Sequence, residues 1–279
     1  TRVDHVFQQH LPDVVFHAAA YKHVPMLEDQ VREAIKNNVL GTRTVALAAD
    51  RSGASGFVLI STDKAVNPTN VMGATKRVAE IFCQNLDARS KTKFITVRFG
   101  NVLDSAGSVV PLFRRQIQEG GPVTVTHEDI ERFFMTIPEA SQLILQASVL
   151  GKGGEIFVLD MGSPVRIKFL AEQMIQLSGK IPYRDIDIVV TGLRPGEKLY
   201  EELFHDLERL QQTSHAKILL ARYREVEWAT LTSTIERLEE ACTASDSDRL
   251  LQLLSELVPE NRINVPRTKE ARPELTNVH

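Results

Sequence analysis

The sequence predicts an α/β protein with a doubly wound parallel, Rossmann-like sheet and a smaller C-terminal substrate-binding part. Short apolar runs alternate with longer helical segments up to about residue 200, a pattern typical of βαβ units. Polar side chains and glycines directly follow several of these runs. Open α/β sheets bind ligands beyond the carboxyl ends of their strands, so we expect these polar residues to form the site.

The first part of the chain is expected to supply a short helix, two strands and a long helix. Apolar side chains recur at helical spacing over residues 3–10 and 28–51. The run 14–20 is apolar, too short for a helix, and ends in alanines. We expect it to be a central parallel strand whose end lets a ligand approach closely. Glycines in 53–56 turn the chain into a second buried strand, 57–60.

Capping residues delimit the elements that follow. A helix is expected to begin near Thr69 or Asn70, either of which is a plausible N-cap after Pro68, and to run to about Ala88. Proline in a first turn and glycine after a last turn mark two later helices. In chain order we expect strand 93–99, a Gly/Ser loop at 100–108, helix 110–119, strand 123–126, helix 138–150, strand 155–159, helix 165–178 and strand 186–190.

The glycine-rich turn that holds a dinucleotide pyrophosphate at the start of such a sheet, G-x-G-x-x-G, does not occur in the sequence. We therefore expect the chain to begin after the first two or three strands of the fold; the alternative is a fold that uses no dinucleotide. The expected domains are an incomplete dinucleotide-binding domain over 1–160, with substrate-site insertions at about 100–135, a C-terminal substrate-binding and helical region over 161–260, and a disordered tail over 261–279.

Composition argues against several classes of function. The net charge of −3 over 279 residues gives no electrostatic argument for nucleic acid or an anionic membrane surface. No apolar run approaches the ~20 residues that span a bilayer. Cys83 and Cys242 fit no metal spacing, so we expect free thiols and no metal site.

The stretch after the second strand carries the densest group of reactive side chains. It places Thr62, Asp63 and Lys64 at the strand end, and Lys76 in the helix that follows. Positions i and i+4 of a helix share a face, so Met72 and Lys76 are expected to point at the same site. The stretch resembles the active-site segment of short-chain dehydrogenases/reductases, which carry Tyr where this chain has Met72. Methionine cannot give or take a proton, so Lys64, Asp63 or a water held by Thr62 are the candidates for removing a hydroxyl proton.

Further polar groups are expected at the same edge of the sheet. Lys22 and His23 follow the strand 14–20 and are well placed for a diphosphate or a sugar hydroxyl. Asn101 follows another strand and can present its amide to a phosphate or a sugar. Arg194 lies in a stiff R-P-G-E-K turn and can bind a diphosphate through two parallel hydrogen bonds.

Five motifs together carry a specific resemblance. They are H-A-A-A-Y-K-H-V-P-M, N-N-V-L-G-T, S-T-D-K-A-V-N-P-T-N-V-M-G-A-T-K, R-F-G-N-V-L-x-S-x-G-S-V-V-P-L-F and R-P-G-E-K-L-Y-E-E-L. The chain resembles the polysaccharide-biosynthesis nucleotide-sugar dehydratases over about residues 5–206. These are extended short-chain dehydrogenases/reductases that act on UDP-N-acetylglucosamine. The resemblance is especially close to the large membrane-anchored members of O-antigen and capsule synthesis, which also have Met at the position of Met72.

The resemblance implies a lyase. The implied reaction is a 4,6-dehydration of UDP-N-acetylglucosamine to a UDP-4-keto-6-deoxy-N-acetylhexosamine with bound NAD or NADP. It implies that Asp63 protonates the leaving C6 hydroxyl, Lys64 takes the C5 proton, Thr62 polarises the C4 hydroxyl and Lys76 binds the cofactor ribose. It also implies cofactor contacts from Ala18, Ala19, Ala20, Asn38 and Ser61, and contacts to the substrate UDP from Asn101 and Arg194.

Two alternatives stay open. A UDP-sugar 4-epimerase on the same scaffold would not need an acid–base pair for elimination, so Asp63 and Lys64 argue against it. A non-catalytic domain that binds UDP-sugar is suggested by Met72 and by the missing phosphate loop. We also expect a homo-oligomer, a full-length protein anchored in the inner membrane with this segment in the cytoplasm, and a weak hold on the dinucleotide by this segment alone.

Overall fold

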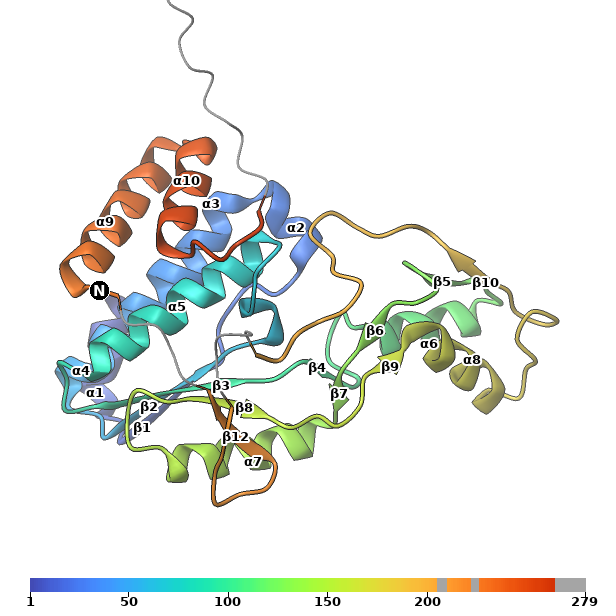
Figure 1. Ribbon diagram of the computed structural model, residues 1–279, viewed down its shortest axis with the longest axis horizontal. Helices are drawn as coiled ribbons and strands as arrows, with labels where there is room; N and C mark the ends of the chain where they lie inside the picture. The colour runs from blue at the N-terminus through green and yellow to red at the C-terminus, as the bar shows by residue number, and fades with distance from the viewer. Residues whose placement is uncertain (205–209, 222–225, 264–279) are drawn as a thin grey trace, which may run out of the picture.

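The structure is a computed structural model that describes residues 1–204, 210–221 and 226–263. A six-stranded sheet lies at its centre, in the order β1-β2-β3-β8-β12-β11 (Figure 1). The first four strands in this order are parallel, and the last two are antiparallel to their neighbours. The predicted doubly wound α/β fold is confirmed. The strands are β1 (Val14–His17), β2 (Gly56–Ile60), β3 (Lys93–Arg98), β8 (Ile156–Leu159), β12 (Ile218–Ala221) and β11 (Gln211–Gln212).

Helices cover both faces of this sheet (Figure 1). Helix α7 (Ile137–Leu150) lies on one face, while α4 (Thr42–Ser52) and α5 (Val71–Asp87) lie on the other. Successive residues of a strand point to opposite faces, so β2 contributes Phe57 to the core under α5 and Val58 to the core under α7. This burial on both faces explains why the strand is a continuous apolar run.

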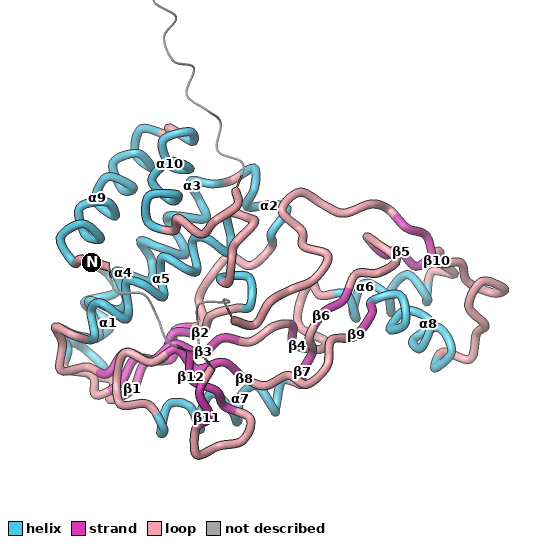
Figure 2. The backbone as a smooth tube through the Cα atoms, in the orientation of Figure 1, coloured by secondary structure: helices cyan, strands magenta, loops and turns pink. Residues whose placement is uncertain are grey.

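A smaller lobe lies at one end of the sheet (Figure 2). Three two-stranded sheets and two helices form it, around a separate core that includes Phe113 and Ile175. Its strands are β4 (Asn101–Val102), β5 (Val123–Val125), β6 (Glu131–Arg132), β7 (Phe134–Met135), β9 (Val165–Arg166) and β10 (Ile188–Val190), and its helices are α6 (Val109–Gln118) and α8 (Ile167–Leu177).

The packing of the two cores does not follow the expected division of the chain into domains 1–160 and 161–260. The smaller lobe draws residues from both ranges, and within the second range β12 joins the main sheet. Helices α9 (Trp228–Ala244) and α10 (Ser247–Leu257) form the outermost layer over α3 (Val31–Ala34) and α5 (Figure 1). We therefore propose a boundary that follows the two cores rather than chain order.

Both ends of the described chain are tied to the rest of the fold. Helix α1 (Arg2–His10) begins with a capping box from Thr1 and packs on α4, as predicted for residues 3–10. The predicted tail, 261–279, lies outside the described residues except for 261–263, where the Arg262 N–H donates to the Pro68 carbonyl at 2.8 Å. No helix in the described part of the chain is long and apolar enough to cross a membrane.

The first strand departs from its prediction. β1 ends at His17 rather than at residue 20, and among the described strands it pairs with β2 alone. It is therefore an edge strand, and the prediction of a central strand is wrong for this chain. Val14 and Phe16 are each 45% exposed, because no described element covers that part of the sheet edge.

The long helix predicted over 28–51 is also wrong at its start. An extra helix, α2 (Val24–Asp29), has Pro25 in its first turn and ends at Gln30, whose φ of −123° and ψ of 50° are not helical. From there α3 (Val31–Ala34) leads through a π-helical turn, η1 (Ile35–Gly41), into α4. A π-helical turn accommodates one extra residue, which the pattern of apolar residues did not reveal.

Candidate active site

The parallel strands β1, β2 and β3 end at the same edge of the sheet, and a cavity of about 370 Å³ lies there. Side chains from four separate stretches line it. The predicted residues in its wall are Ala18, Ala20, Lys22, His23, Ser61, Thr62, Lys64, Met72, Lys76 and Asn101. The structure thus brings most of the predicted site residues to one cavity, although their individual roles stay predictions.

A single 3-10 turn after β2, η2 (Asp63–Ala65), orients the reactive side chains. Thr62 is its N-cap, and the Thr62 hydroxyl accepts from the Lys64 N–H at 3.4 Å and donates to Asp63 Oδ1 at 2.8 Å. The N–H of Asp63 donates to the carbonyl of Phe99, just after β3, at 3.1 Å. The turn is therefore fixed to the neighbouring strand as well as to its own cap.

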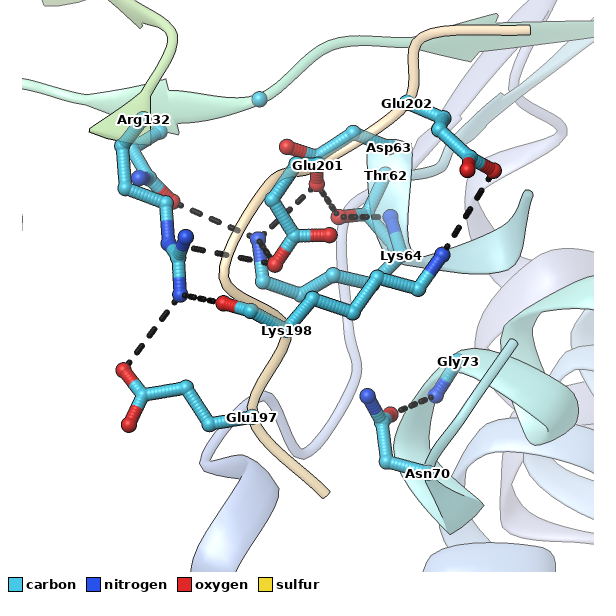
Figure 3. Close-up of polar contacts among 12 residues, drawn as sticks. Thr62, Asp63, Lys64, Asn70, Gly73, Arg132, Glu197, Lys198, Glu201 and Glu202 are labelled. Carbon is cyan, nitrogen blue, oxygen red and sulfur yellow. Dashed lines mark hydrogen bonds and ion pairs between the residues drawn. The ribbon is translucent and has the colours of Figure 1, made fainter. Parts of the chain in front are cut away.

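Asp63 and Lys64 form an ion pair beside the cavity (Figure 3). The Lys64 ammonium donates to Asp63 Oδ1 at 2.9 Å. Asp63 is fully buried and does not line the cavity, whereas Thr62 and Lys64 do. A proton can therefore pass between the cavity and Asp63 through either of these two hydrogen-bonded neighbours.

The other oxygen of this carboxylate, Asp63 Oδ2, is buried and has no hydrogen-bond partner among the described residues. It lies against Gly100, where a Cβ would be only 2.9 Å from it. A buried carboxylate oxygen without a donor carries a desolvation cost, and such costs concentrate at functional sites. The close approach also explains why the residue after Phe99 is a glycine.

Glu201 is a second carboxylate beside Lys64, and no role was expected for it from the sequence. Its Oε1 lies 3.6 Å from Nζ of Lys64 (Figure 3), and its side chain is 3% exposed. Residues 191–204, the described stretch that contains it, form no regular helix or strand, so no periodicity placed it near the site. The one sequence feature that could have indicated a role for Glu201 is its position in the R-P-G-E-K-L-Y-E-E-L motif.

Charges around Lys64 decide its protonation state. Burial lowers the pKa of Lys64, but the charges of Asp63 and Glu201 outweigh burial and raise it above its ordinary value. Burial raises the pKa of Glu201, and the charges of Lys64 and Arg132 oppose that rise without cancelling it. Nε of Arg132, in β6, lies 3.9 Å from Oε1 of Glu201. Lys64 is thus held as an ammonium at neutral pH.

Met72 and Lys76 lie on the first turns of α5 and face the cavity, as their spacing predicted. The helix begins at its N-cap Asn70, whose Oδ1 accepts from the Gly73 N–H at 2.7 Å. The Lys76 ammonium donates to the Ile60 carbonyl at 2.6 Å, which uses one of its three donors. Burial lowers the pKa of Lys76 to about 8.

Ser61 is tied to a buried ion network behind the cavity. Its hydroxyl donates to Glu80 Oε1 at 2.6 Å, and Arg98 donates to both oxygens of Glu80 at 2.8 and 2.7 Å. Burial would raise the pKa of Glu80, but the charge and hydrogen bonds of Arg98 outweigh burial and lower it to about 2. This network was not expected from the sequence, because Glu80 and Arg98 read as ordinary helix and strand residues.

Ala19 and Asn38 do not line the cavity. Asn38 is fully buried in η1, where its Oδ1 accepts from the Tyr21 N–H at 2.8 Å. Its amide nitrogen donates to the Tyr21 carbonyl at 3.1 Å and to the Thr75 hydroxyl at 3.0 Å. Its side chain therefore fixes the segment after β1 to α5, and its contact with a cofactor stays a prediction.

Arg194 lines a second cavity of about 190 Å³ rather than the first one. Asn101 and Arg132 also line this second cavity, and Asn101 lines the first cavity as well. The two cavities thus adjoin at Asn101. The carboxylate of Glu197 forms an ion pair with the guanidinium of Arg132 at 3.4 Å. The guanidinium of Arg194 therefore does not need Glu197 as its ion-pair partner.

Comparisons with known proteins give a consistent picture. The sequence profile of a family described as "Polysaccharide biosynthesis protein" matches residues 1–223. The chain is 52% identical over 250 residues to the probable polysaccharide biosynthesis protein EpsC of Bacillus subtilis, covering 90% of this chain and 42% of EpsC. It is 58% identical over 219 residues to the capsular polysaccharide biosynthesis protein CapD of Staphylococcus aureus, covering 78% and 36%. The chain thus spans about four-tenths of these relatives' length.

Further similarities are to a relative named as a UDP-glucose 4-epimerase and to two solved structures. The chain is 40% identical over 198 residues to the UDP-glucose 4-epimerase of Rickettsia canadensis, covering 70% of this chain and 56% of the epimerase. Among solved structures, Pen from Bacillus thuringiensis is 41% identical with a TM-score of 0.68, covering 73% and 63%. A UDP-glucose 4-epimerase of Thermus thermophilus in complex with NAD shares the fold, with a TM-score of 0.64, 19% identity and 72% coverage of both chains.

Proposed function

The chain belongs to the polysaccharide biosynthesis protein family, and from this premise we propose that it catalyses the 4,6-dehydration of UDP-N-acetylglucosamine with bound NAD. The product would be a UDP-4-keto-6-deoxy-N-acetylhexosamine. Support for the nucleotide-sugar chemistry comes from the identity to UDP-glucose 4-epimerases. The choice of dehydration rests on the Asp63–Lys64 ion pair.

That ion pair is the observation that carries the proposal. Oxidation and reduction at C4 alone need one group that exchanges a proton with the C4 hydroxyl. Eliminating water across C5 and C6 needs two more proton transfers, one from C5 and one to the leaving oxygen. Asp63 and Lys64 are 2.9 Å apart, share one labile proton and communicate with the cavity through Lys64 and Thr62.

The residues present fit the nicotinamide ribose end of a dinucleotide in the first cavity. The alanines at 18 and 20 leave room at the end of β1, and the Lys76 ammonium has donors beyond its bond to Ile60. We propose that Lys76 and Ser61 hold the ribose end of the cofactor. A bound dinucleotide would supply reversible oxidation of the C4 hydroxyl to a ketone.

The proton inventory of the elimination balances within the ion pair. Transfer of the shared proton from Lys64 to Asp63 leaves a neutral amine beside a carboxylic acid. The amine takes the C5 proton, the electrons of that C–H bond form the C5–C6 double bond, and the C6–O bond breaks. The leaving oxygen takes the proton of Asp63 and departs as water, which restores the ammonium and the carboxylate. The return of the hydride to C6 and a proton passed from Lys64 to C5 would then give the 4-keto-6-deoxy sugar, and Lys64 would regain a proton from the cavity.

Thr62 offers a route for the C4 hydroxyl proton in a chain that has Met72 at the tyrosine position. Its hydroxyl lines the cavity and donates to Asp63 Oδ1 at 2.8 Å. A proton taken from a sugar hydroxyl by the Thr62 oxygen can therefore be passed on to the Asp63 carboxylate. Lys64, which lines the cavity, would release a proton there and take this one from Asp63, so that the pair is again an ammonium and a carboxylate when the elimination begins. We propose that Arg194 and Asn101 bind the UDP diphosphate in the second cavity.

A 4-epimerase is the second candidate, because the chain is 40% identical to enzymes of that name. One incubation of the complete natural protein with UDP-N-acetylglucosamine separates the two. A product lighter by one water, whose 4-ketone absorbs in alkali, supports dehydration. An isomer of unchanged mass would replace our proposal with epimerisation, and UDP binding without turnover would replace it with a non-catalytic domain.

A variant of Lys64 tests the proposed base directly. In deuterium oxide the wild-type product should carry deuterium at C5. Lys64→Ala should lose this exchange while it still binds UDP, because it removes the amine that takes the C5 proton. Retained exchange in the variant would remove Lys64 from the mechanism.

A further inference from the structure

The segment that carries Glu201 is held against the loop that directly follows Lys64 and its turn η2. Residues 196–202 lie along the loop between η2 and α5, and hydrogen bonds from four side chains join the two. These bonds run from Asn70 Nδ2 to the Gly196 carbonyl at 3.0 Å, from Thr69 Oγ1 to the same carbonyl at 3.3 Å, from Lys198 Nζ to the Val66 carbonyl at 3.1 Å, and from Asn67 Nδ2 to Glu202 Oε2 at 2.6 Å.

Arg132 holds the same segment from the other side. Its guanidinium donates to the carbonyl of Lys198 at 2.8 Å and to the carbonyl of Leu199 at 3.2 Å. It also lies 3.9 Å from the Glu201 carboxylate. The segment is thus anchored on both sides. These anchors fix the backbone of Glu201 beside Lys64, so the side chain is not free to move as an exposed one would be.

The environment of Glu201 indicates more than a structural ion pair. Its side chain is 3% exposed, and its Oε2 has no hydrogen-bond partner among the described residues. The groups that face it are Lys64 from η2, Asp63 from the same turn, Arg132 from β6 and Lys198 from its own segment. A buried carboxylate with an unused oxygen is costly, and a purely structural role would be served as well by an apolar side chain.

We propose that Glu201 is a positioning residue that acts through Lys64: it keeps Lys64 protonated over the working pH range, so that the Asp63–Lys64 pair retains its shared proton. This inference rests on the proposed dehydration, which uses that proton. Without the second carboxylate, Lys64 would lose its proton at a lower pH, and Asp63 could no longer receive one from it.

The charges around Lys64 determine in which direction its pKa moves when Glu201 is removed. Glu201 is an opposite charge 3.6 Å from the ammonium and therefore favours the charged form of Lys64. Removing such a neighbour lowers a lysine pKa by about one unit or more. The alkaline limb of the pH–rate profile, where Lys64 loses its proton, should move to lower pH by the same amount.

The test compares Glu201→Gln with wild type in the complete natural protein. The rate of 4-keto product formation from UDP-N-acetylglucosamine is measured across the pH range. The alkaline limb of the variant should lie about one pH unit lower. Glu202→Gln is the matched control, because Glu202 is the next residue along the chain and is 48% exposed. A glutamine there still accepts the hydrogen bond from Asn67 that anchors the segment, so losing the charge alone should leave the limb in place.

A second readout does not depend on turnover. Competitive acylation of lysine amines at a series of pH values, read by mass spectrometry, gives the midpoint at which Lys64 becomes reactive. That midpoint should fall by about one unit in Glu201→Gln and stay unchanged in Glu202→Gln. Should the amide not be accommodated, Glu201→Ala removes the same charge and is judged by the same midpoint.

The outcomes separate the two proposals. A wild-type protein that forms no 4-keto product overturns the proposed function, while the acylation midpoint still tests the link between Glu201 and Lys64. An active wild type whose Glu201→Gln variant keeps both the alkaline limb and the acylation midpoint overturns the role of Glu201 alone.

Discussion

Lys76 places an ammonium in a buried position, and this has a cost for the fold. Because its pKa is about 8 in the folded chain against an ordinary value of 10.5, the protonated form is disfavoured by folding. Stability is therefore reduced below pH 8 and rises between about pH 8 and 10.5. We expect Lys76→Met to raise the free energy of unfolding at pH 7 by about 1 to 3 kcal/mol, measured by urea titration, and to weaken cofactor binding.

Lys93 provides the control for this prediction. It lies at the exposed start of β3, so Lys93→Met should change stability by no more than about 0.5 kcal/mol. The rise in wild-type stability above pH 8 should be absent in Lys76→Met and present in Lys93→Met. A Lys76→Met variant less stable than wild type would contradict a net cost of the buried ammonium.

At the residue scale, the sequence predicted the groups that follow a strand directly and missed those that reach the site from afar. Thr62 and Lys64 could be placed because a parallel strand delivers the residues after its carboxyl end to a known edge. Glu201 and Arg132 could not be placed. Their approach depends on how an irregular segment and the smaller lobe pack against that edge, and no local pattern encodes this.

At the scale of elements, the contact between α5 and η2 requires a glycine. A Cβ at Gly73 would lie 2.0 Å from the carbonyl oxygen of Lys64, so an alanine there would force the helix away from the turn. We expect Gly73→Ala to cost about 3 kcal/mol of stability, measured by thermal unfolding, and to abolish turnover by separating Lys64 from Lys76.

Gly56 offers a matched substitution at the start of β2. A Cβ there would meet only Val14 Cγ1, at an ordinary 3.9 Å. Gly56→Ala should therefore leave the unfolding temperature nearly unchanged. Equal effects of the two substitutions would show that the contact between helix and turn is not the cause.

Helix and strand positions were largely predictable, whereas the joints between them were not. Thr69 and Asn70 were both expected as caps because Pro68 precedes them and an apolar helix follows, and the structure shows Asn70 to be the cap. The break at Gln30 was missed because residues 28–51 carry apolar side chains at spacings compatible with one helix. The edge position of β1 was missed because an apolar strand looks the same whether one neighbour or two pair with it.

At the scale of the whole molecule, Glu80 links elements that are far apart in the chain. It receives hydrogen bonds from Ser61 after β2, Arg98 in β3 and Arg77 in its own helix, and Arg77 also pairs with Glu260 after α10. A pKa of about 2 in the fold against an ordinary 4.5 means that this stabilisation is present above pH 4.5. It is lost as the pH falls from about 4.5 to 2, and it amounts to about 3 kcal/mol.

Glu80→Gln should therefore destabilise the protein by about 3 to 5 kcal/mol at pH 7, because it removes the buried negative charge that the guanidinium groups of Arg98 and Arg77 both face. Its free energy of unfolding should also depend less on pH between about 5 and 2 than that of wild type. Chemical denaturation at several pH values measures both effects. Glu236→Gln, on the exposed side of α9, should reproduce the wild-type dependence; a wild-type slope in Glu80→Gln would refute the assignment.

The π-helical turn Ile35–Gly41 has a consequence for how this gene can vary. A π-helical turn holds one residue more than the α-helical turn it replaces, so losing one codon within it leaves a regular helix whose two ends keep their relative rotation. Val31 and Ala34, before the turn, would then stay in the core. The loss would fall on the turn itself, where the Asn38 side chain holds Tyr21. We therefore expect a single-codon deletion here to preserve the helix and to act mainly on the segment after β1.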